Sequence, residues 1–70
     1  MKLHYYPETD SHYISLSGDT AVDAVEVVDG LVADIDAEGR VVGLDIDNAS
    51  THLDLSTVET IDLPMPSKAV

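Results

Sequence analysis

The segment from Leu31 to Asp47 constrains the fold most, because apolar and polar residues alternate on both sides of a glycine-containing turn. A period of two places alternate side chains on opposite faces of a strand. The turn Ala37-Glu38-Gly39-Arg40 therefore predicts an antiparallel hairpin between Leu31–Asp36 and Val41–Asp47. Counting back from the turn gives three apolar pairs on the inner face: Ile35 with Val42, Ala33 with Leu44, and Leu31 with Ile46.

The other face of these strands is expected to be acidic and to collect Glu26, Asp34, Asp36, Asp45 and Asp47, with Val32 and Gly43 between them. Mg²⁺ and Ca²⁺ prefer several carboxylate oxygens. Residues two apart on a strand lie about 6.6 Å apart, however, and a flat sheet provides no enclosing loop. We interpret this face as a solvated acidic surface, with a specific divalent-cation site or a small enzyme using the carboxylates as the alternative.

A first hairpin is predicted between Lys2–Tyr6 and Ser11–Leu16, around the proline-led turn Pro7-Glu8-Thr9-Asp10. This loop length places Tyr5 opposite His12 and Leu3 opposite Ile14. The inner face then carries Leu3, Tyr5, Ile14 and Leu16, and the outer face carries Lys2, His4, Tyr6, Tyr13 and Ser15.

A third strand, Val22–Val28, is predicted to pair with Leu31–Asp36, and two registers compete. A two-residue Asp29-Gly30 turn would put Glu26 on the face of Ala33. A loop of Val28-Asp29-Gly30 instead aligns Val27 with Leu31 and Val25 with Ala33, with Gly30 in the left-handed region. We favour the second register, because burying an unpaired carboxylate costs several kcal/mol.

The C-terminal part has the form of a capping box, Ser56-Thr57-Val58-Glu59, which predicts a short helix, although its β-branched residues favour a strand. The apolar residues here are expected to close one side of the sheet: Leu53, Leu55, Val58, Ile61 and Leu63. The predicted class is mainly β (α+β), an antiparallel meander of about five strands with a short C-terminal helical segment. Residues 1–63 are expected to form one domain, and 64–70 a flexible tail.

The amino-acid composition makes several classes of function unexpected. The 70-residue chain has no Phe, Trp or Cys, and its 14 acidic residues against 3 Lys and Arg give a formal net charge of −11. Nucleic-acid binding is therefore not expected, because it depends on cationic side chains. The start of the chain lacks a signal peptide's apolar run, and no stretch suits a membrane helix, so we expect a cytoplasmic protein without membrane contact. The Asp-rich, Lys-poor usage is typical of halophilic proteins.

One set of residues follows a distinctive order along most of the chain: Tyr5, Pro7-Glu8, Asp10, Tyr13-Ile14, Leu16, Glu26-Val27, Gly30, Asp34, Asp36, Gly39-Arg40-Val41-Val42-Gly43 and Asn48-Ala49-Ser50. In these residues the chain resembles the DUF2283 family, small β-rich proteins of unknown function. The resemblance implies a β-rich fold with a C-terminal helical segment and supplies no catalytic residues. The chain departs from the family pattern at Tyr6, where Asp is usual, and at His12, where Leu is usual.

No motif for catalysis is present, so we expect neither an enzyme nor a cofactor. His4, His12 and His52 do not have the spacing of a zinc site. Exposed aromatic residues favour contacts between proteins, and His4, Tyr6 and Tyr13 are the candidate interface. The sequence thus predicts a non-catalytic interaction module that forms a homodimer or larger symmetric oligomer. A second form of this hypothesis is an antitoxin-like partner of a small basic protein.

Overall fold

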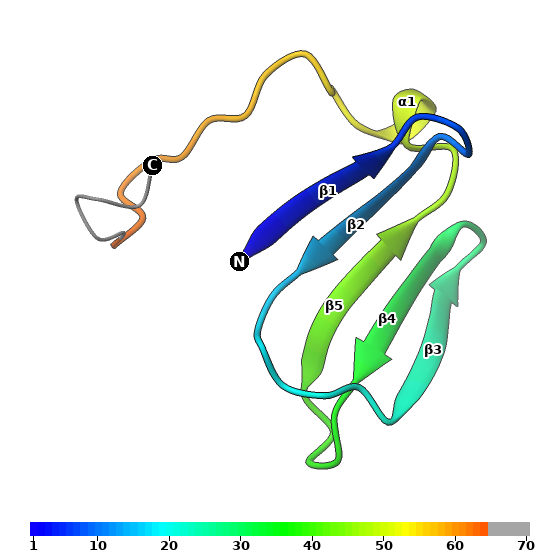
Figure 1. Ribbon diagram of the computed structural model, residues 1–70, viewed down its shortest axis with the longest axis vertical. Coiled ribbons are helices and arrows are strands. Elements are labelled where there is room, and N and C mark those ends of the chain that lie inside the picture. Colours follow the sequence, from blue (N-terminus) through cyan, green and yellow to red (C-terminus); the bar gives the residue numbers. More distant parts are fainter. Residues whose placement is uncertain (65–70) are drawn as a thin grey trace.

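The computed structural model describes residues 1–64, and in this part of the chain five strands form one open antiparallel sheet with a single short helix (Figure 1). The strands are β1 (Lys2–Tyr6), β2 (Ser11–Ser15), β3 (Asp23–Val28), β4 (Leu31–Ile35) and β5 (Val41–Ile46), in the order β1-β2-β5-β4-β3. The predicted fold class is confirmed. The predicted flexible tail lies, apart from Pro64, outside the described residues.

Two rows of side chains cross the apolar face of the sheet, which we define by these rows. Strand pairing aligns Leu3, Ile14, Leu44, Ala33 and Val25 in the first row, and Tyr5, His12, Ile46, Leu31 and Val28 in the second. The opposite or outer face carries the alternating residues Lys2, Ser15, Gly43, Asp34 and Ala24, and His4, Tyr13, Asp45, Val32 and Glu26. Because alternation has a period of two, each strand contributes to both faces.

The hairpin between β1 and β2 has the predicted register, with Tyr5 opposite His12 and Leu3 opposite Ile14. In the hairpin between β3 and β4, Val25 lies opposite Ala33 as predicted, and Gly30 has a positive φ of 87°. The predicted Val27–Leu31 pair is wrong. A bulge displaces Val27, so that Val28 pairs with Leu31 across a tight Asp29-Gly30 turn.

A second irregularity separates the observed β4–β5 register from the predicted one. Ala33 lies opposite Leu44, and Leu31 opposite Ile46, but Ile35 pairs with Val41 and not with Val42. Val42 is buried, and its carbonyl accepts bonds of 2.8 Å from Leu16 N–H and 3.3 Å from Ser17 N–H. The extra residue in β5 therefore supplies an acceptor for the chain that leaves β2.

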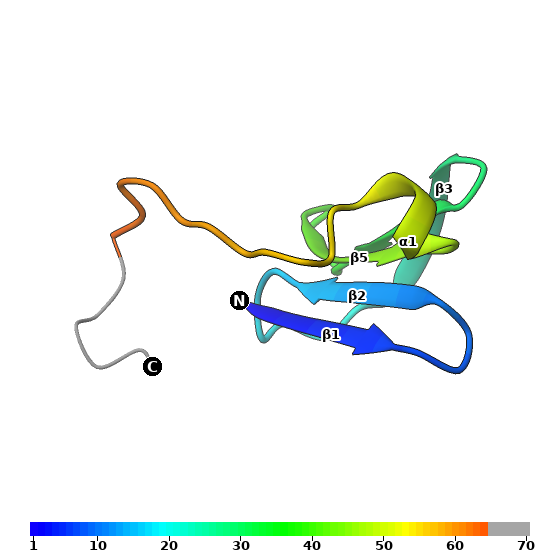
Figure 2. The ribbon, with the colours of Figure 1, turned by 90° about the horizontal axis from the view of Figure 1, so that it is seen from above.

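The helix occupies a different position from the capping-box segment. Helix α1 covers Ala49–His52, and residues 56–59 are not helical. Asn48 precedes the helix in the left-handed conformation (φ 52°). In Figure 2, α1 lies above one face of a strongly twisted sheet, and the chain beyond it runs out past β1. Within residues 1–64, no helix is long and apolar enough to cross a membrane.

Candidate interaction surfaces

Tyr13 lies in the middle of the outer face and is held by contacts within its own sheet. Its hydroxyl donates a 2.8 Å hydrogen bond to Oδ2 of Asp34, so the side chain reaches from β2 to β4 across β5. Its ring passes over Gly43, where an added Cβ would collide with the Tyr13 side chain. The bond to Asp34 raises the pKa of Tyr13. Tyr13 therefore ties three strands together.

His4 and Tyr6 form a stacked pair on the edge strand β1. Their ring centroids are 4.1 Å apart and the planes differ by 11°. Both side chains are exposed, and His4 lies directly opposite Tyr13 in the β1–β2 register. The structure thus brings the three predicted interface residues to the outer face, with Tyr13 already engaged and the stacked pair open to solvent. Their participation in an interface stays a prediction.

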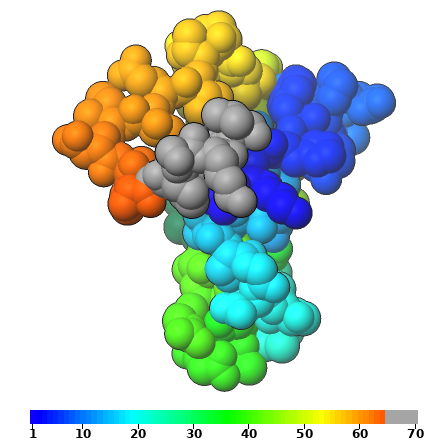
Figure 3. Space-filling model, turned by 60° about the vertical axis from the view of Figure 1, so that its left-hand side comes forward, coloured from blue at the N-terminus to red at the C-terminus, as the bar shows by residue number. Residues whose placement is uncertain are grey.

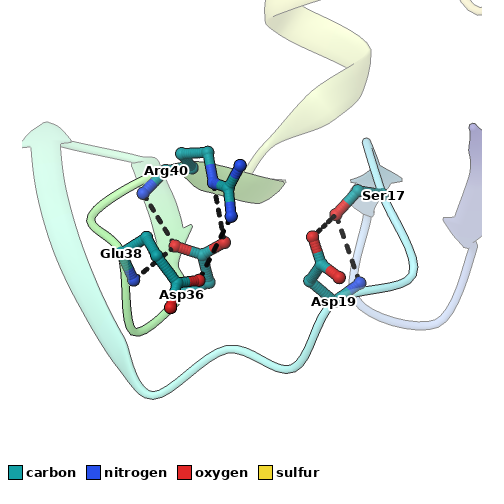
Figure 4. A network of polar contacts seen from close by, with 5 residues as sticks. All are labelled: Ser17, Asp19, Asp36, Glu38 and Arg40. Carbon is teal, nitrogen blue, oxygen red and sulfur yellow. Dashed lines mark hydrogen bonds and ion pairs between the residues drawn. The ribbon is translucent and has the colours of Figure 1, made fainter.

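The predicted acidic cluster is divided between two environments. Asp36 does not join the outer face: it is buried in the β4–β5 turn, where its Oδ1 accepts 2.9 Å bonds from Glu38 N–H and Arg40 N–H (Figure 4). Oδ2 of Asp36 lies 3.4 Å from Nε of Arg40. The Arg40 N–H contributes most to lowering the pKa of Asp36. This carboxylate therefore closes the turn. In the loop between β2 and β3, Ser17 and Asp19 bond to each other over longer distances of 3.2 and 3.4 Å (Figure 4).

The carboxylates that do lie on the outer face are in separate environments. Burial raises the pKa of Asp45, and repulsion by Asp47 and Asp34 adds to this effect. Asp34 is engaged by the Tyr13 hydroxyl. Within residues 1–64, no group of three or more His, Asp or Glu side chains has an arrangement that could hold a metal ion. The acidic side chains of the outer face therefore repel one another, and those that the structure describes do not converge on a common cation position.

Asp10 joins the first hairpin to the helix, a role that sequence reasoning missed. Its Oδ1 accepts a 2.7 Å bond from the Tyr5 hydroxyl and a 3.1 Å bond from Ser50 N–H, and its Oδ2 accepts a 2.7 Å bond from Ser50 Oγ. Its carbonyl accepts a 2.8 Å bond from Ala49 N–H. The Ser50 hydroxyl is the main cause of the lowered pKa of Asp10. The signal was available, since all four residues belong to the set that carries the family resemblance.

The apolar face is largely uncovered. Val25 is 49% exposed and Val28 59%, and among the described residues only Ala33, Val42 and Ala49 are buried apolar side chains. Two open hollows lie on this face, both lined by Leu53. One of about 240 Å³ is bounded by α1, Leu31 and Ile46. The other, of about 400 Å³, lies between residues 53–58 and the side chains of Leu3, Tyr5, His12 and Ile14.

His12 is the one polar side chain in the middle of this face. It is 9% exposed, and its buried Nδ1 has no hydrogen-bond partner. The five residues predicted to close this side of the sheet do so only in part. Leu53, Leu55 and Val58 border the hollow over the β1–β2 hairpin, but all of the five except Leu53 are exposed. The expectation that all five side chains close one side of the sheet is therefore wrong for a single copy of the chain.

A single-layer antiparallel sheet with one charged face and one uncovered apolar face defines a small β domain without an enclosed site. A comparison of the sequence with models of protein families gives a match. Residues 2–50 match the family model DUF2283, described as protein of unknown function, and the chain belongs to this family. No curated protein and no solved structure matches it. The matched range contains the whole sheet and ends within α1, so that residues 53–64 lie beyond it.

Proposed function

We propose that the protein is a non-catalytic interaction module that assembles with further copies of itself through the apolar face of its sheet. The observation that supports this most directly is the exposure of that face: Leu3 is 48% exposed, Val25 49% and Val28 59%, although all three lie in its rows. Contiguous exposed apolar side chains of this kind are typical of sites where proteins associate.

A second copy suits this face better than a charged partner. The two rows that define the face contain no carboxylate and no Lys or Arg, so they offer nothing that selects a basic protein. When the apolar faces of two copies are turned towards each other, the sheets lie about 10 Å apart if they pack directly, and further apart if chain segments lie between them. In both cases the two acidic outer faces point away from each other, separated by more than the screening length of about 10 Å in about 0.1 M salt.

The outer face supports a second, weaker candidate. An antitoxin-like partnership with a small basic protein would use the charge of −11 and the exposed His4 and Tyr6 side chains. Tyr13 contributes less to such a contact, because its hydroxyl is already bonded to Asp34. Cation binding or catalysis by the carboxylates finds less support than either, since Asp34 and Asp36 are engaged by the chain's own donors.

A pair of neighbouring substitutions tests the proposal. Val25 lies on the apolar face, and the adjacent Ala24 lies on the outer face opposite Asp34. Both belong to the exposed edge strand β3, so that a lysine is tolerated at either position. Light scattering in molar KCl is expected to show an oligomer for the wild type and for Ala24→Lys, and a smaller species for Val25→Lys. A monomeric wild type contradicts the proposed function.

The outer-face alternative makes the opposite prediction. If the double variant Tyr6→Ser with Tyr13→Ser loses the oligomer while Val25→Lys keeps it, the contact lies on the outer face. Retention of the oligomer in the tyrosine variant supports the apolar face.

A further inference from the structure

We propose that the C-terminal arm, which we define as residues 53–63, is anchored at Leu53 on its own sheet and lies with its remaining residues across the apolar face of a second copy, so that two chains exchange arms. This inference rests on the proposed function and names the segment that covers the face. It starts from two observations on one molecule. The apolar face of the sheet is largely uncovered, and apolar side chains of the arm are themselves largely exposed: Val58 is 74% exposed and Ile61 76%.

The arm is only loosely tied to its own sheet. The backbone bond from Leu53 N–H to the Ala49 carbonyl, 2.8 Å long, ends the helix. Beyond it, in the described residues up to 64, the hydrogen bonds of the arm are those from Ser56 to the Asp54 carboxylate. Figures 1 and 2 show the arm passing beyond β1, and in Figure 3 its orange part projects to one side of the body. Residues 53–58 therefore border one edge of the apolar face, and the chain beyond them leads away from it.

The dimensions of the arm fit a sheet of this size. Five strands spaced about 4.8 Å apart span about 19 Å, and the ten residues after Leu53 reach about 33 Å when extended. One arm is thus long enough to cross all five strands of a partner. Its polar residues are interspersed with the apolar ones, so that Asp54, Glu59 and Asp62 are able to face solvent while the apolar side chains turn to the sheet.

Exchange satisfies both surfaces at once. Leu53 stays seated between the two hollows of its own sheet, while Val58, Ile61 and Leu63 cover the neighbour's rows. The arrangement is a symmetric pair in which each chain gives an arm and receives one. The sequence-based expectation that these residues close one side of a sheet is then met between copies, although a single copy does not meet it.

Matched substitutions within the arm test the inference in the full-length chain. Val58→Asp with Ile61→Asp places charges at two exposed positions and should weaken dimerisation by roughly 100-fold or more, because two apolar side chains no longer become buried. The control, Thr57→Asp with Thr60→Asp, adds the same charge to the same segment and should weaken it far less. Equal effects of the two pairs would remove the arm from the interface.

Cross-linking distinguishes exchange from simple closure. The chain contains no cysteine, so that a heavy-isotope Val25→Cys protein and a light Ile61→Cys protein can be mixed and treated with a short bismaleimide. A heavy–light link between positions 25 and 61 supports exchange. If the wild type is a dimer but this link forms only within the Val25→Cys, Ile61→Cys double variant, the arm folds onto its own sheet and the inference is wrong. A monomeric wild type overturns the proposed function as well.

Discussion

Carboxylates of this protein serve as acceptors for its own backbone and hydroxyl groups. Asp10 accepts bonds from Tyr5 and Ser50, Asp34 accepts one from Tyr13, and Asp36 accepts two from the turn that follows it. These bonds connect elements up to 40 positions apart in the chain. Three of the acidic residues that carry the family resemblance, Asp10, Asp34 and Asp36, therefore have structural roles.

The close approach of Tyr13 to Gly43 gives a prediction at this scale. Gly43→Ala should lower the free energy of unfolding by about 1–3 kcal/mol, because the methyl group displaces the Tyr13 ring from its position over β5. Gly18→Ala is the control, since a Cβ at that glycine meets nothing within 4 Å. Denaturant unfolding measures both. Similar losses for the two variants would mean that the ring does not lie over Gly43.

The pH dependence of stability follows from two opposite pKa shifts. Hydrogen bonds lower the pKa values of Asp10 and Asp36, so their stabilisation is complete above about pH 4, the pKa of an unfolded Asp, and is lost as the pH falls through their lower folded values. Burial raises the pKa of Asp45, so its protonation relieves a penalty at a higher pH.

The melting temperature should therefore hold or rise as the pH falls from 7 towards about 4.5, and should fall steeply below about 4. Thermal unfolding across this range measures the profile. Asp45→Asn should flatten the upper part of the profile and leave the steep lower part in place. A decline that begins near pH 6 would contradict these assignments.

Turns decide the register at the scale of secondary-structure elements. Gly30 has a φ of 87°, a conformation that a residue with a Cβ adopts only with strain. Gly30→Ala should therefore cost about 1–2 kcal/mol of unfolding free energy, whereas Gly30→Asn should cost less because Asn tolerates this region. Chemical denaturation compares them. An alanine variant as stable as the wild type would show that the Asp29-Gly30 turn has another conformation.

Alternation and turn chemistry were sufficient to predict the strands and most of their pairing. The pairs Leu3–Ile14, Val25–Ala33 and Ala33–Leu44 follow from local patterns, because each hairpin closes over a short loop. The bulges at Val27 and Val42 were not predictable in the same way. A bulge depends on hydrogen bonds with a neighbouring segment of the chain. The Val42 carbonyl accepts bonds from Leu16 and Ser17, which follow β2 and are distant in sequence.

The position of the helix was missed for a similar reason. The capping-box pattern at Ser56 is local, whereas Ala49–His52 is held by the carbonyl and carboxylate of Asp10. The grouping of His4, Tyr6 and Tyr13 on one face was predictable from strand periodicity. The engagement of Tyr13 by Asp34 was not, because it required the β2–β5–β4 order.

Charge acts on the molecule as a whole. A formal net charge of −11 on 70 residues causes self-repulsion that favours the unfolded chain. Salt screens this repulsion, so the melting temperature should rise between dilute buffer and molar KCl. Replacing several exposed aspartates whose side chains make no hydrogen bond within residues 1–64, such as Asp29 and Asp47, by asparagine should reduce this rise. A melting temperature that is constant or decreases with KCl would contradict the argument.

The central claim at this scale is that one copy of the chain is an incomplete fold whose apolar face is buried by a second copy. If folding and association are linked in this way, the melting temperature depends on protein concentration. Scanning calorimetry of the wild type in molar KCl, over a 100-fold range of protein concentration, tests the claim most directly. The account predicts that the melting temperature rises by roughly 5–10 °C across this range. A melting temperature that does not change with concentration would contradict it.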